Sequence, residues 1–380
     1  MIKKPTIALV AITAHTINSF MLKNIEYLNK KYNLLIFCND ISLIEKKIPK
    51  NISLININFK RKLNLVSDIV SFFIILYNFL KLKPKLTISI TPKAGFLTAL
   101  ASFIARISYR LHWFTGQTWV TKKGLVRFVY KISEKLIFNL SHHVLVDSHS
   151  QKNFLIANNI ITKEKSTVLL CGSVGGVNIK KFKYKKKSKN ILKKLKISKK
   201  NFIFLYLGRL NKDKGILDLI QAFNDIQKNY NTTLILVGPI EEINIVEIIK
   251  KCRNIIHIGQ TLAPEKWFSI ANILCLPSYR EGFGSVIIEA GACSLPALGS
   301  NIYGIQDAII KNKTGFFHKV GSVKDLKKKM IFAIKNKKLL KKYGKMAKKR
   351  VILKFEEKLI GKKLLEFVNS KLYFKTKLIN

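Results

Sequence analysis

Acidic residues are scarce in this sequence of 380 residues, which contains 21 Asp and Glu against 69 Lys and Arg and has a formal net charge of +48. Nucleic acid and an anionic membrane surface are the partners that such a charge suggests. The sequence contains no nucleic-acid recognition motif and no basic block interleaved with stacking aromatic residues, so a membrane surface is favoured over nucleic acid. A codon bias of an AT-rich genome toward Lys, Ile and Asn is an alternative that involves no function.

Paired cysteines, a leader peptide and a membrane-spanning run are also missing. The five cysteines are scattered and form no Cys-x-x-Cys pair, which predicts reduced, buried thiols and a cytoplasmic protein. Met1 leads almost directly into an apolar segment at 6–12, so no signal peptide is predicted. The longest apolar run, 69–80, is too short to cross a bilayer, and we expect no transmembrane segment. The seven histidines form no credible metal cluster.

Short apolar runs of strand length alternate with segments of helical periodicity, and this pattern occurs twice along the chain. The predicted strands are 6–12, 33–38, 52–57, 86–90, 109–114, 144–147, 202–207, 233–237, 255–258, 273–276 and 296–299. The predicted helices are 19–31, 69–82, 95–107, 215–229, 242–251, 264–271 and 285–292, with a lysine-rich helical tail. The alternation predicts the α/β class, with two Rossmann-like domains in tandem.

The domain boundaries follow from the same pattern. We predict a first domain at 1–182, a lysine-rich linker region at 183–200, a second domain at 201–355 and a C-terminal helix within 356–380. Hydrophobic residues make up 48% of the sequence, which is enough to supply two cores.

Several candidate functional residues of the second domain lie in one stretch of the sequence. The apolar strand 273–276 is followed by a glycine-containing turn with Glu281 and then by a helix that starts at Ser285. A strand, a tight turn and a helix N-terminus form a ready anion site, because free backbone N–H groups point outward there. Glu289 lies inside the helix, where a carboxylate is costly unless it is paired or binds something. Taken alone, the two glutamates have an equally good structural explanation, in which Glu281 is an ordinary surface residue and Glu289 forms a salt bridge on the helix.

The spacing of Glu281 and Glu289 resembles the E-x7-E signature of retaining, nucleotide-sugar-dependent glycosyltransferases of family 4, of the bacterial surface-polysaccharide type. Three further blocks agree with that family in order and spacing. Residues 205–215 resemble its phosphate-binding Arg and Lys segment, 171–182 the end of its first domain and 300–305 a loop after its next strand. The resemblance implies the GT-B fold, in which two Rossmann-like domains face each other across a cleft and the last helix crosses back to the first domain.

The resemblance also implies a donor site in the second domain and an acceptor site in the first. Transfer from a nucleoside-diphosphate sugar needs the leaving diphosphate to be neutralised, and the sequence has no Asp-x-Asp motif to hold a metal. We therefore predict no metal and no cofactor, with the donor, a UDP-sugar in preference to a GDP-sugar, as substrate. Arg209 and Lys214 are the candidate cations. In isolation, Arg209 and Lys214 would be interpreted as two solvated surface residues. Their G-R-L-x-x-x-K-G context favours a phosphate-binding role instead.

Roles for the remaining site residues are implied by the family. Glu289 would accept hydrogen bonds from the ribose hydroxyls, Glu281 would face the transferred sugar, and the amides of Phe283 and Gly284 would lie beside sugar and diphosphate. The predicted catalytic residues are His112, Glu281, Arg209 and Lys214. The predicted donor-binding residues are Arg209, Lys214, Gly259, Phe283, Gly284, Ser285 and Glu289.

The first domain gives weaker indications. His112 aligns with a histidine that the family places near the donor sugar, and the alternative is a packed histidine at a strand end. Family members often carry a Gly-Gly loop after the first strand, whereas 13–19 of this chain contains no glycine. Either the side chains of Thr13, His15 or Thr16 replace the backbone contacts of that loop, or the loop serves the acceptor.

The family resemblance implies a retaining hexosyl- or N-acetylhexosaminyl-transferase of O-antigen, capsule or lipopolysaccharide synthesis. Its acceptor would be a glycan or a polyprenyl-linked glycan, and the enzyme would be peripheral on the inner face of the cytoplasmic membrane. The alternatives are an inverting transferase, an epimerase-like enzyme, or an inactive basic scaffold on membrane or nucleic acid. Membrane contact is expected near the apolar helices 69–82 and 95–107. The lysines expected there are Lys60, Lys62, Lys81, Lys83, Lys85, Lys122 and Lys123.

Overall fold

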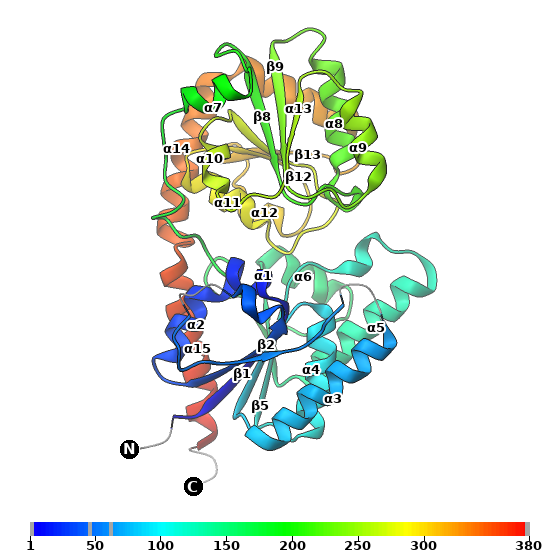
Figure 1. Cartoon of the computed structure of the whole chain (residues 1–380), viewed down its shortest axis with the longest axis vertical. Coiled ribbons are helices and arrows are strands. Elements are labelled where there is room, and N and C mark those ends of the chain that lie inside the picture. Colours follow the sequence, from blue (N-terminus) through cyan, green and yellow to red (C-terminus); the bar gives the residue numbers. More distant parts are fainter. Residues whose placement is uncertain (1–3, 45–47, 61–63, 377–380) are drawn as a thin grey trace. The chain divides into compact units, whose positions relative to one another are not determined.

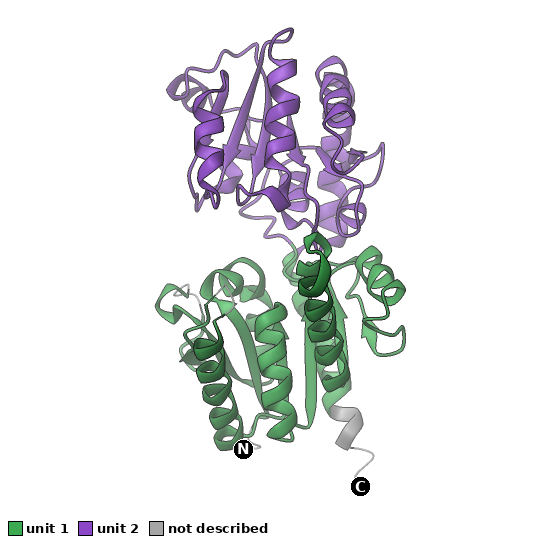
Figure 2. Ribbon diagram, turned by 90° about the vertical axis from the view of Figure 1, so that its right-hand side faces the viewer, with its two compact units in different colours: residues 1–176, 357–380 green, residues 177–356 purple. Residues whose placement is uncertain are grey.

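The computed structural model describes residues 4–44, 48–60 and 64–376, so that Lys62 lies outside the described residues. The chain divides into two compact units (Figure 2). Unit 1 comprises Met1–Gly176 together with Glu357–Asn380, and unit 2 comprises Val177–Glu356.

Unit 1 contains a parallel sheet of seven strands in the order β3-β2-β1-β4-β5-β6-β7. Its strands are β1 Thr6–Thr13, β2 Asn33–Asn39, β3 Ser53–Asn56, β4 Leu86–Ile90, β5 Tyr109–Phe114, β6 His143–Val146 and β7 Ser166–Thr167. The strand order reverses between β1 and β4, and ligands of doubly wound sheets bind at the carboxyl ends of the strands beside such a point.

Helices cover both faces of this sheet. They are α1 Ala14–Thr16, α2 Leu22–Asn29, α3 Leu65–Leu82, α4 Pro92–Ile104, α5 Gly124–Leu140, α6 His149–Ala157 and α15 Glu357–Thr376, with a π-helix at Ile17–Met21. Because successive side chains of a strand point to opposite faces, Ile7 and Leu9 of β1 pack toward α2 and α15, whereas Ala8 and Val10 pack toward α3 and α4. The long C-terminal helix α15 therefore belongs to the core of unit 1 (Figure 1).

Unit 2 repeats the strand order of unit 1, with a parallel sheet in the order β10-β9-β8-β11-β12-β13. Its strands are β8 Phe202–Leu207, β9 Thr232–Val237, β10 Ile255–Ile258, β11 Ile273–Leu276, β12 Ala297–Ser300 and β13 Gly315–His318. Its helices are α7 Lys189–Lys194, α8 Ile216–Ile226, α9 Ile243–Lys250, α10 Pro264–Phe268, α11 Ser285–Ala292, α12 Ile305–Ala308, α13 Val323–Lys335 and α14 Lys337–Lys354. The central strands β8, β9 and β11 are buried except for Leu207 at the end of β8, as their continuous apolar runs require.

The predicted α/β fold with two Rossmann-like domains is confirmed, although several elements differ from the sequence prediction. Helix α5 and strand β13 had not been predicted. β13 has only four residues and begins at a glycine, which is depleted in strands, so the run is too short to be recognised from sequence. Residues 13–19, expected as a loop, are largely helical.

Helix α3 is longer than its apolar run indicated. It begins at Leu65, because the Asn64 side chain caps it by accepting a hydrogen bond from the Ser67 N–H over 2.9 Å. At 18 residues with a mean hydropathy of 1.8, it is long and apolar enough to cross a membrane by length and composition, which corrects the expectation that this run is too short. In the fold, Ile75 and Phe79 of α3 are buried against the sheet, and the Phe79 ring lies 5.6 Å from that of Phe37.

Candidate active site

Three loops meet at the carboxyl ends of β8, β11 and β12 in unit 2, and two glycines allow their close approach. A Cβ atom on Gly215, whose φ is +66°, would lie 2.0 Å from the Pro277 carbonyl oxygen. A Cβ atom on Gly304, whose φ is +79°, would lie 2.6 Å from the Gly282 carbonyl oxygen. Only glycine fits at both positions. The sequence blocks 205–215, 278–290 and 300–305 therefore form one structure.

The loop after β11 is also tied to the loop after β8 by hydrogen bonds. The Tyr279 N–H donates to the Asp213 carbonyl over 2.9 Å, and Arg280 Nε donates to Asp213 Oδ2 over 2.8 Å. The Tyr279 hydroxyl donates to Asp218 Oδ2 of α8 over 2.7 Å. These bonds fix the position of Glu281 relative to β8.

Lys214 and Glu281 form an ion pair, with 2.6 Å between Lys214 Nζ and Glu281 Oε1. The same carboxylate oxygen accepts a hydrogen bond from the Ser278 hydroxyl over 2.9 Å. The two side chains are 19% and 14% exposed, so the pair lies at the surface of the loop cluster but is largely shielded from water. Two residues chosen from separate sequence motifs are thus in direct contact.

Arg209 is held by a carboxylate that sequence reasoning missed. Its Nη1 donates to both oxygens of Glu241, over 3.0 and 2.8 Å, and Glu241 also accepts from the Asn211 side chain over 2.7 Å. The Arg209 side chain is 41% exposed, and exposed ion pairs contribute only about 0.2–1 kcal/mol. Exchange of Glu241 for a phosphate on Arg209 would therefore cost little.

Helix α11 follows this loop and carries the other predicted donor contacts. Gly284 precedes the helix with a φ of +75°, and Ser285 is its first residue. Phe283 is buried, and its ring lies 5.3 Å from that of Phe355. This contact anchors the turn that precedes α11 to the core. Burial raises the pKa of the Glu289 carboxyl to about 7, and the nearby Lys181 ammonium opposes that rise.

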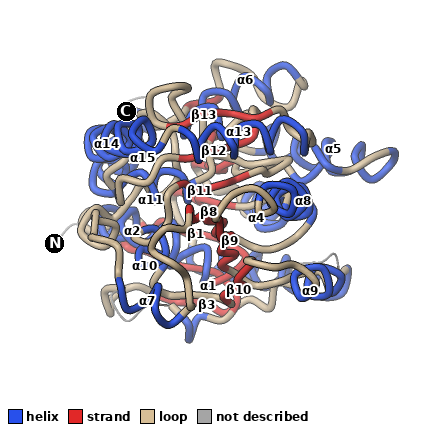
Figure 3. Tube along the Cα trace, turned by 90° about the horizontal axis from the view of Figure 1, so that it is seen from above, coloured by secondary structure: helices blue, strands red, loops and turns tan. Residues whose placement is uncertain are grey.

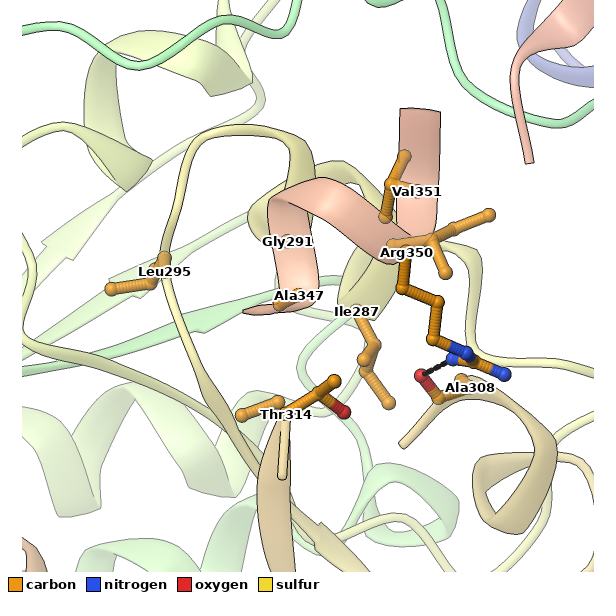
Figure 4. Close-up of a pocket in the computed structure, with 10 residues that line it drawn as sticks. Ile287, Gly291, Leu295, Ala308, Thr314, Ala347, Arg350 and Val351 are labelled. Carbon is orange, nitrogen blue, oxygen red and sulfur yellow. Dashed lines mark hydrogen bonds between the residues drawn. The ribbon is translucent and has the colours of Figure 1, made fainter. Parts of the chain in front are cut away.

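The back of α11 is packed against α14 (Figure 4). Arg350 of α14 donates to the carbonyl oxygens of Ala308 and Asp307 over 2.7 and 2.6 Å, and Gly291 faces Val351. A cavity of about 10 Å³ lies among these residues, which is room for one water molecule at most. It is a gap in the packing that supports α11, and it is too small to bind a substrate.

Gly259 lies outside this loop cluster. Gly259 follows β10, the edge strand of the sheet, and β9 separates β10 from β8. A Cβ atom at Gly259 would have no neighbour within 4 Å, so the backbone there is accessible. His112 belongs to β5 of unit 1.

The His112 side chain is 1% exposed. Its Nδ1 lies 2.8 Å from the Ser89 hydroxyl, and its ring packs on Phe114. A Cβ atom on Gly95 would lie 2.3 Å from His112 Cε1, so the glycine of α4 makes room for the imidazole. Burial lowers the pKa of His112 to about 3, which keeps the ring neutral.

Sequence reasoning missed Glu241, Asp213 and Ser278. Asp213 lies inside the G-R-L-x-x-x-K-G block and Ser278 next to Glu281, so both were within the motifs already identified. Glu241 follows β9, and the rule that parallel strands end at one edge of the sheet could have placed it beside β8. Among residues 4–44, 48–60 and 64–376, no group of three His, Cys, Asp or Glu side chains could hold a metal ion.

Comparison with known proteins identifies relatives of this chain. A family model described as glycosyl transferases group 1 matches residues 187–350. The capsular polysaccharide biosynthesis glycosyltransferase CapM of Staphylococcus aureus is 32% identical over 320 residues, which cover 83% of this chain and 84% of that protein. The N,N'-diacetylbacillosaminyl-diphospho-undecaprenol alpha-1,3-N-acetylgalactosaminyltransferase of Campylobacter jejuni is 28% identical over 251 residues, or 64% of this chain and 65% of that protein.

Solved structures show the same fold over nearly the whole chain. Sucrose-phosphate synthase from Thermosynechococcus elongatus has a TM-score of 0.79 at 19% identity and covers 99% of this chain and 100% of its own. HepE from Anabaena, solved in complex with UDP and glucose, has a TM-score of 0.77 at 18% identity and covers 96% of this chain and 100% of its own. Together with the loop cluster of unit 2 and the long match to CapM, these findings establish that the chain is a glycosyltransferase and belongs to the group 1 glycosyl transferases.

Proposed function

We propose that this enzyme is a retaining transferase that moves a hexosyl or N-acetylhexosaminyl group from a UDP-sugar to a glycan or lipid-linked glycan of a bacterial surface polysaccharide. That polysaccharide would be a capsule, an O-antigen or a lipopolysaccharide. The printed names of the relatives support this class, since one acts in capsular polysaccharide biosynthesis and another is named for a diphospho-undecaprenol acceptor. The structural neighbour with bound UDP and glucose supports the donor.

The observation that carries the proposal is the contact of Lys214 with Glu281 in front of the N-terminus of α11. Negative charge develops on the diphosphate as the bond from the anomeric carbon to the phosphate oxygen breaks. Lys214, Arg209 and the first amides of α11 supply positive potential at one place, and preorganised groups of this kind stabilise such charge. Glu281 orients the Lys214 ammonium and faces the transferred sugar.

Nucleoside recognition is assigned to the flanking residues. We place the ribose hydroxyls on Glu289, because an ionised carboxylate can accept hydrogen bonds from two adjacent hydroxyls. Lys181, whose ammonium favours the ionised form of Glu289, supports this assignment. The base would meet the accessible backbone at Gly259. The amides of Phe283, Gly284 and Ser285 would contact the diphosphate and the sugar.

We infer that the reaction needs no metal, and this arrangement of cations supports the inference. The chain has no Asp-x-Asp motif, and two basic side chains gather where the diphosphate would bind. His112 is assigned a positioning role, because its neutral, buried imidazole bonds to Ser89 and packs beneath α4. It would fix the carboxyl end of β5 without exchanging a proton at neutral pH.

Unit 1 supplies a pocket for the acceptor. A cavity of about 320 Å³ opens at the carboxyl ends of β1 and β2, within the usual range of about 300–1,000 Å³ for ligand sites. It is lined by Thr13, Ala14, His15, Asn39, Asp40, Leu43 and Phe59. Apolar and polar side chains together suit a sugar ring, which has both C–H faces and hydroxyls. The Thr13 hydroxyl caps helix α1 by accepting from the Thr16 N–H, so these two side chains are engaged within the helix, and we assign this segment to the acceptor instead of the diphosphate.

Titration of the purified enzyme with UDP, followed by a screen of UDP-sugars against lipid-linked and soluble glycans, tests the proposal. We expect saturable UDP binding, product with the donor's anomeric configuration, and full activity in EDTA. Absence of UDP binding would refute the UDP-sugar donor, inversion of configuration would refute the retaining mechanism, and loss of activity in EDTA would refute metal independence. The peripheral location of the enzyme at the inner face of the cytoplasmic membrane is part of this proposal.

A further inference from the structure

Large apolar side chains are exposed along one layer of helices in unit 1. Helix α4 contacts α3 on one side and α5 on the other, so the three helices form a continuous layer (Figure 1). We call its outward side the apolar face of α3–α5. It comprises Leu65, Val66, Ile69, Val70, Phe73, Tyr77, Leu80 and Leu82 of α3, Phe103 and Ile104 of α4, and Leu125, Val126, Phe128, Val129 and Ile132 of α5. Exposed apolar areas of this extent in a folded protein mark an interaction surface.

Helix α5 has an apolar stripe on its outer side. Leu125, Phe128, Val129 and Ile132 follow the i, i+3, i+4, i+7 spacing of one helix face, and Leu125 and Phe128 are 76% and 59% exposed. A separate set, which includes Ile137 and Phe138, packs inward. Figure 3 shows that part of α5 lies at the periphery, away from the strands. The side chains of the outer stripe therefore do not contribute to the hydrophobic core of unit 1.

Charges around this face have one sign. Arg127, Lys131 and Lys135 lie on α5, and Lys122 and Lys123 precede it. Arg127 and Lys131 lie over the Trp119 ring, at 5.6 and 5.1 Å from its centroid. Lys81, Lys83 and Lys85 lie at the end of α3 and just beyond it. A surface that joins apolar side chains to cations matches the interface of a bilayer with anionic headgroups.

The acidic residues of these helices do not alter that charge. Glu134 is the acidic residue within Gly124–Leu140, and it is buried, accepting a hydrogen bond from Trp119 Nε1 over 2.7 Å. Asp68 is the acidic residue within Leu65–Leu82, and it is paired with Lys93 over 2.8 Å. A second copy of the same face would bring like charges together, which disfavours a dimer as the occupant.

We propose that the apolar face of α3–α5 rests on an anionic lipid bilayer, with the outer stripe of α5 and the outer side chains of α3 in the headgroup region. This inference rests on the proposed function, because a lipid-linked acceptor is presented at such a surface. Although α3 is long enough to span a membrane, its contacts with α4 and the sheet hold it in the fold, so it lies along the bilayer instead of crossing it. Helix α5 thus adds a contact that the apolar runs at 69–82 and 95–107 did not indicate.

Co-sedimentation of the full chain with phosphatidylcholine vesicles, with and without phosphatidylglycerol, tests the inference. We expect binding that needs phosphatidylglycerol and decreases as salt rises. Phe128→Glu should weaken it about tenfold, in line with the loss of one inserted aromatic side chain. The matched control is Ile243→Glu on α9 of unit 2, where an isoleucine that is 85% exposed, against 59% for Phe128, should tolerate the change. Because both positions are exposed, neither variant should disturb folding.

Equal vesicle binding by Phe128→Glu and Ile243→Glu, or no binding of the wild-type chain at low salt, would overturn the inference. A dimer that Phe128→Glu dissociates, without vesicle binding, would identify a second copy as the occupant and overturn it as well. UDP affinity is measured for each protein in lipid-free solution. Normal UDP affinity without vesicle binding refutes this surface alone, whereas vesicle binding without UDP affinity refutes the proposed function alone.

Discussion

Units 1 and 2 share one strand order but differ in what lies at the carboxyl ends of their strands. In unit 2, charged side chains from separate loops meet there, with the pairs Lys214–Glu281 and Arg209–Glu241 at 2.6 and 2.8 Å. In unit 1, the site residue predicted from sequence is His112 of β5, the strand that corresponds to β12, and it is a neutral and buried imidazole. One architecture therefore carries ion pairs at the surface of unit 2, where we propose that the diphosphate binds, and a neutral, buried imidazole in unit 1.

The outer helices of the two units differ as well. The exposed large apolar residues of unit 1 gather on α3, α4 and α5, whereas those described in unit 2, such as Ile243 and Leu262, are scattered over several elements. Burial of a sheet between helices accounts for the inner face of each helix and places no demand on the outer face. A concentration of apolar residues on the outside of one unit therefore indicates a requirement other than folding.

The strongest test of the contrast removes the cations of unit 2. Replacement of Arg209 or Lys214 with Ala should slow transfer by about 10²–10³-fold, as expected for loss of one preorganised electrostatic contact. Steady-state kinetics with a UDP-sugar measures the effect. Glu241→Gln is the matched control, since it releases Arg209 from its ion pair while preserving the cation, and it should leave the rate within a few-fold of wild type. Equal losses in all three variants would point to a structural role for the loop.

Glu289 provides the next largest effect. Glu289→Ala should weaken UDP binding by about 10–100-fold, the range for hydrogen bonds to a charged group. Because the pKa of Glu289 is raised to about 7, its carboxylate is charged above and protonated below that pH. UDP affinity should therefore fall between pH 8 and pH 6 in the wild type, and calorimetry at several pH values measures it. Glu289→Gln should show a low affinity that stays constant over this range; a slope as steep as that of the wild type would exclude Glu289 as its source.

The sequence predicted unit 2 more completely than unit 1 for a physical reason. The loops that carry Lys214 and Glu281 are short, and each is encoded by a contiguous block with glycines at the strained positions Gly215 and Gly284. Their residue types could be chosen from sequence, although the ion pair that joins them depends on tertiary structure. Glu241 belongs to no motif, so only the sheet order brings it to Arg209.

Helix α5 illustrates what sequence patterns omit in unit 1. Its apolar residues occupy an inner and an outer side, so periodicity alone does not separate a core face from an exposed one. The pocket at β1 and β2 is likewise assembled from three segments that are distant in sequence, 13–15, 39–43 and Phe59. Exposure and cavities are properties of the folded chain.

A smaller effect is expected at the buried histidine of unit 1. Gly95→Ala should destabilise the fold by about 1–3 kcal/mol, because the new methyl group overlaps the His112 ring. Denaturant unfolding measures the loss. In the double variant with His112→Ala the overlap disappears, so the combined loss should be smaller than the sum of the single losses. Additive losses would show that Gly95 is constrained by something other than His112.

Glu134 is a buried carboxyl of unit 1 whose pKa, like that of Glu289 in unit 2, is raised by burial, so its effect is measured through the pH dependence of stability. Burial raises the pKa of Glu134 to about 8 from an unfolded value near 4.5, although its hydrogen bond from Trp119 opposes the rise. Between these two values the folded state holds a proton that the unfolded state has released, so the contribution of Glu134 to stability falls as pH increases.

Glu134→Gln keeps an oxygen for the Trp119 N–H but cannot ionise. The stability of the variant relative to the wild type should therefore rise from about pH 4.5 to pH 8 and then level off, since the difference in bound protons vanishes above the folded-state pKa. Urea unfolding of both proteins at a series of pH values measures this difference and cancels the large background from the other charges. A difference that is flat with pH would mean that Glu134 is ionised in the fold. In that case α5 would carry a buried negative charge, and the purely cationic surround of the apolar face of α3–α5 would have to be revised.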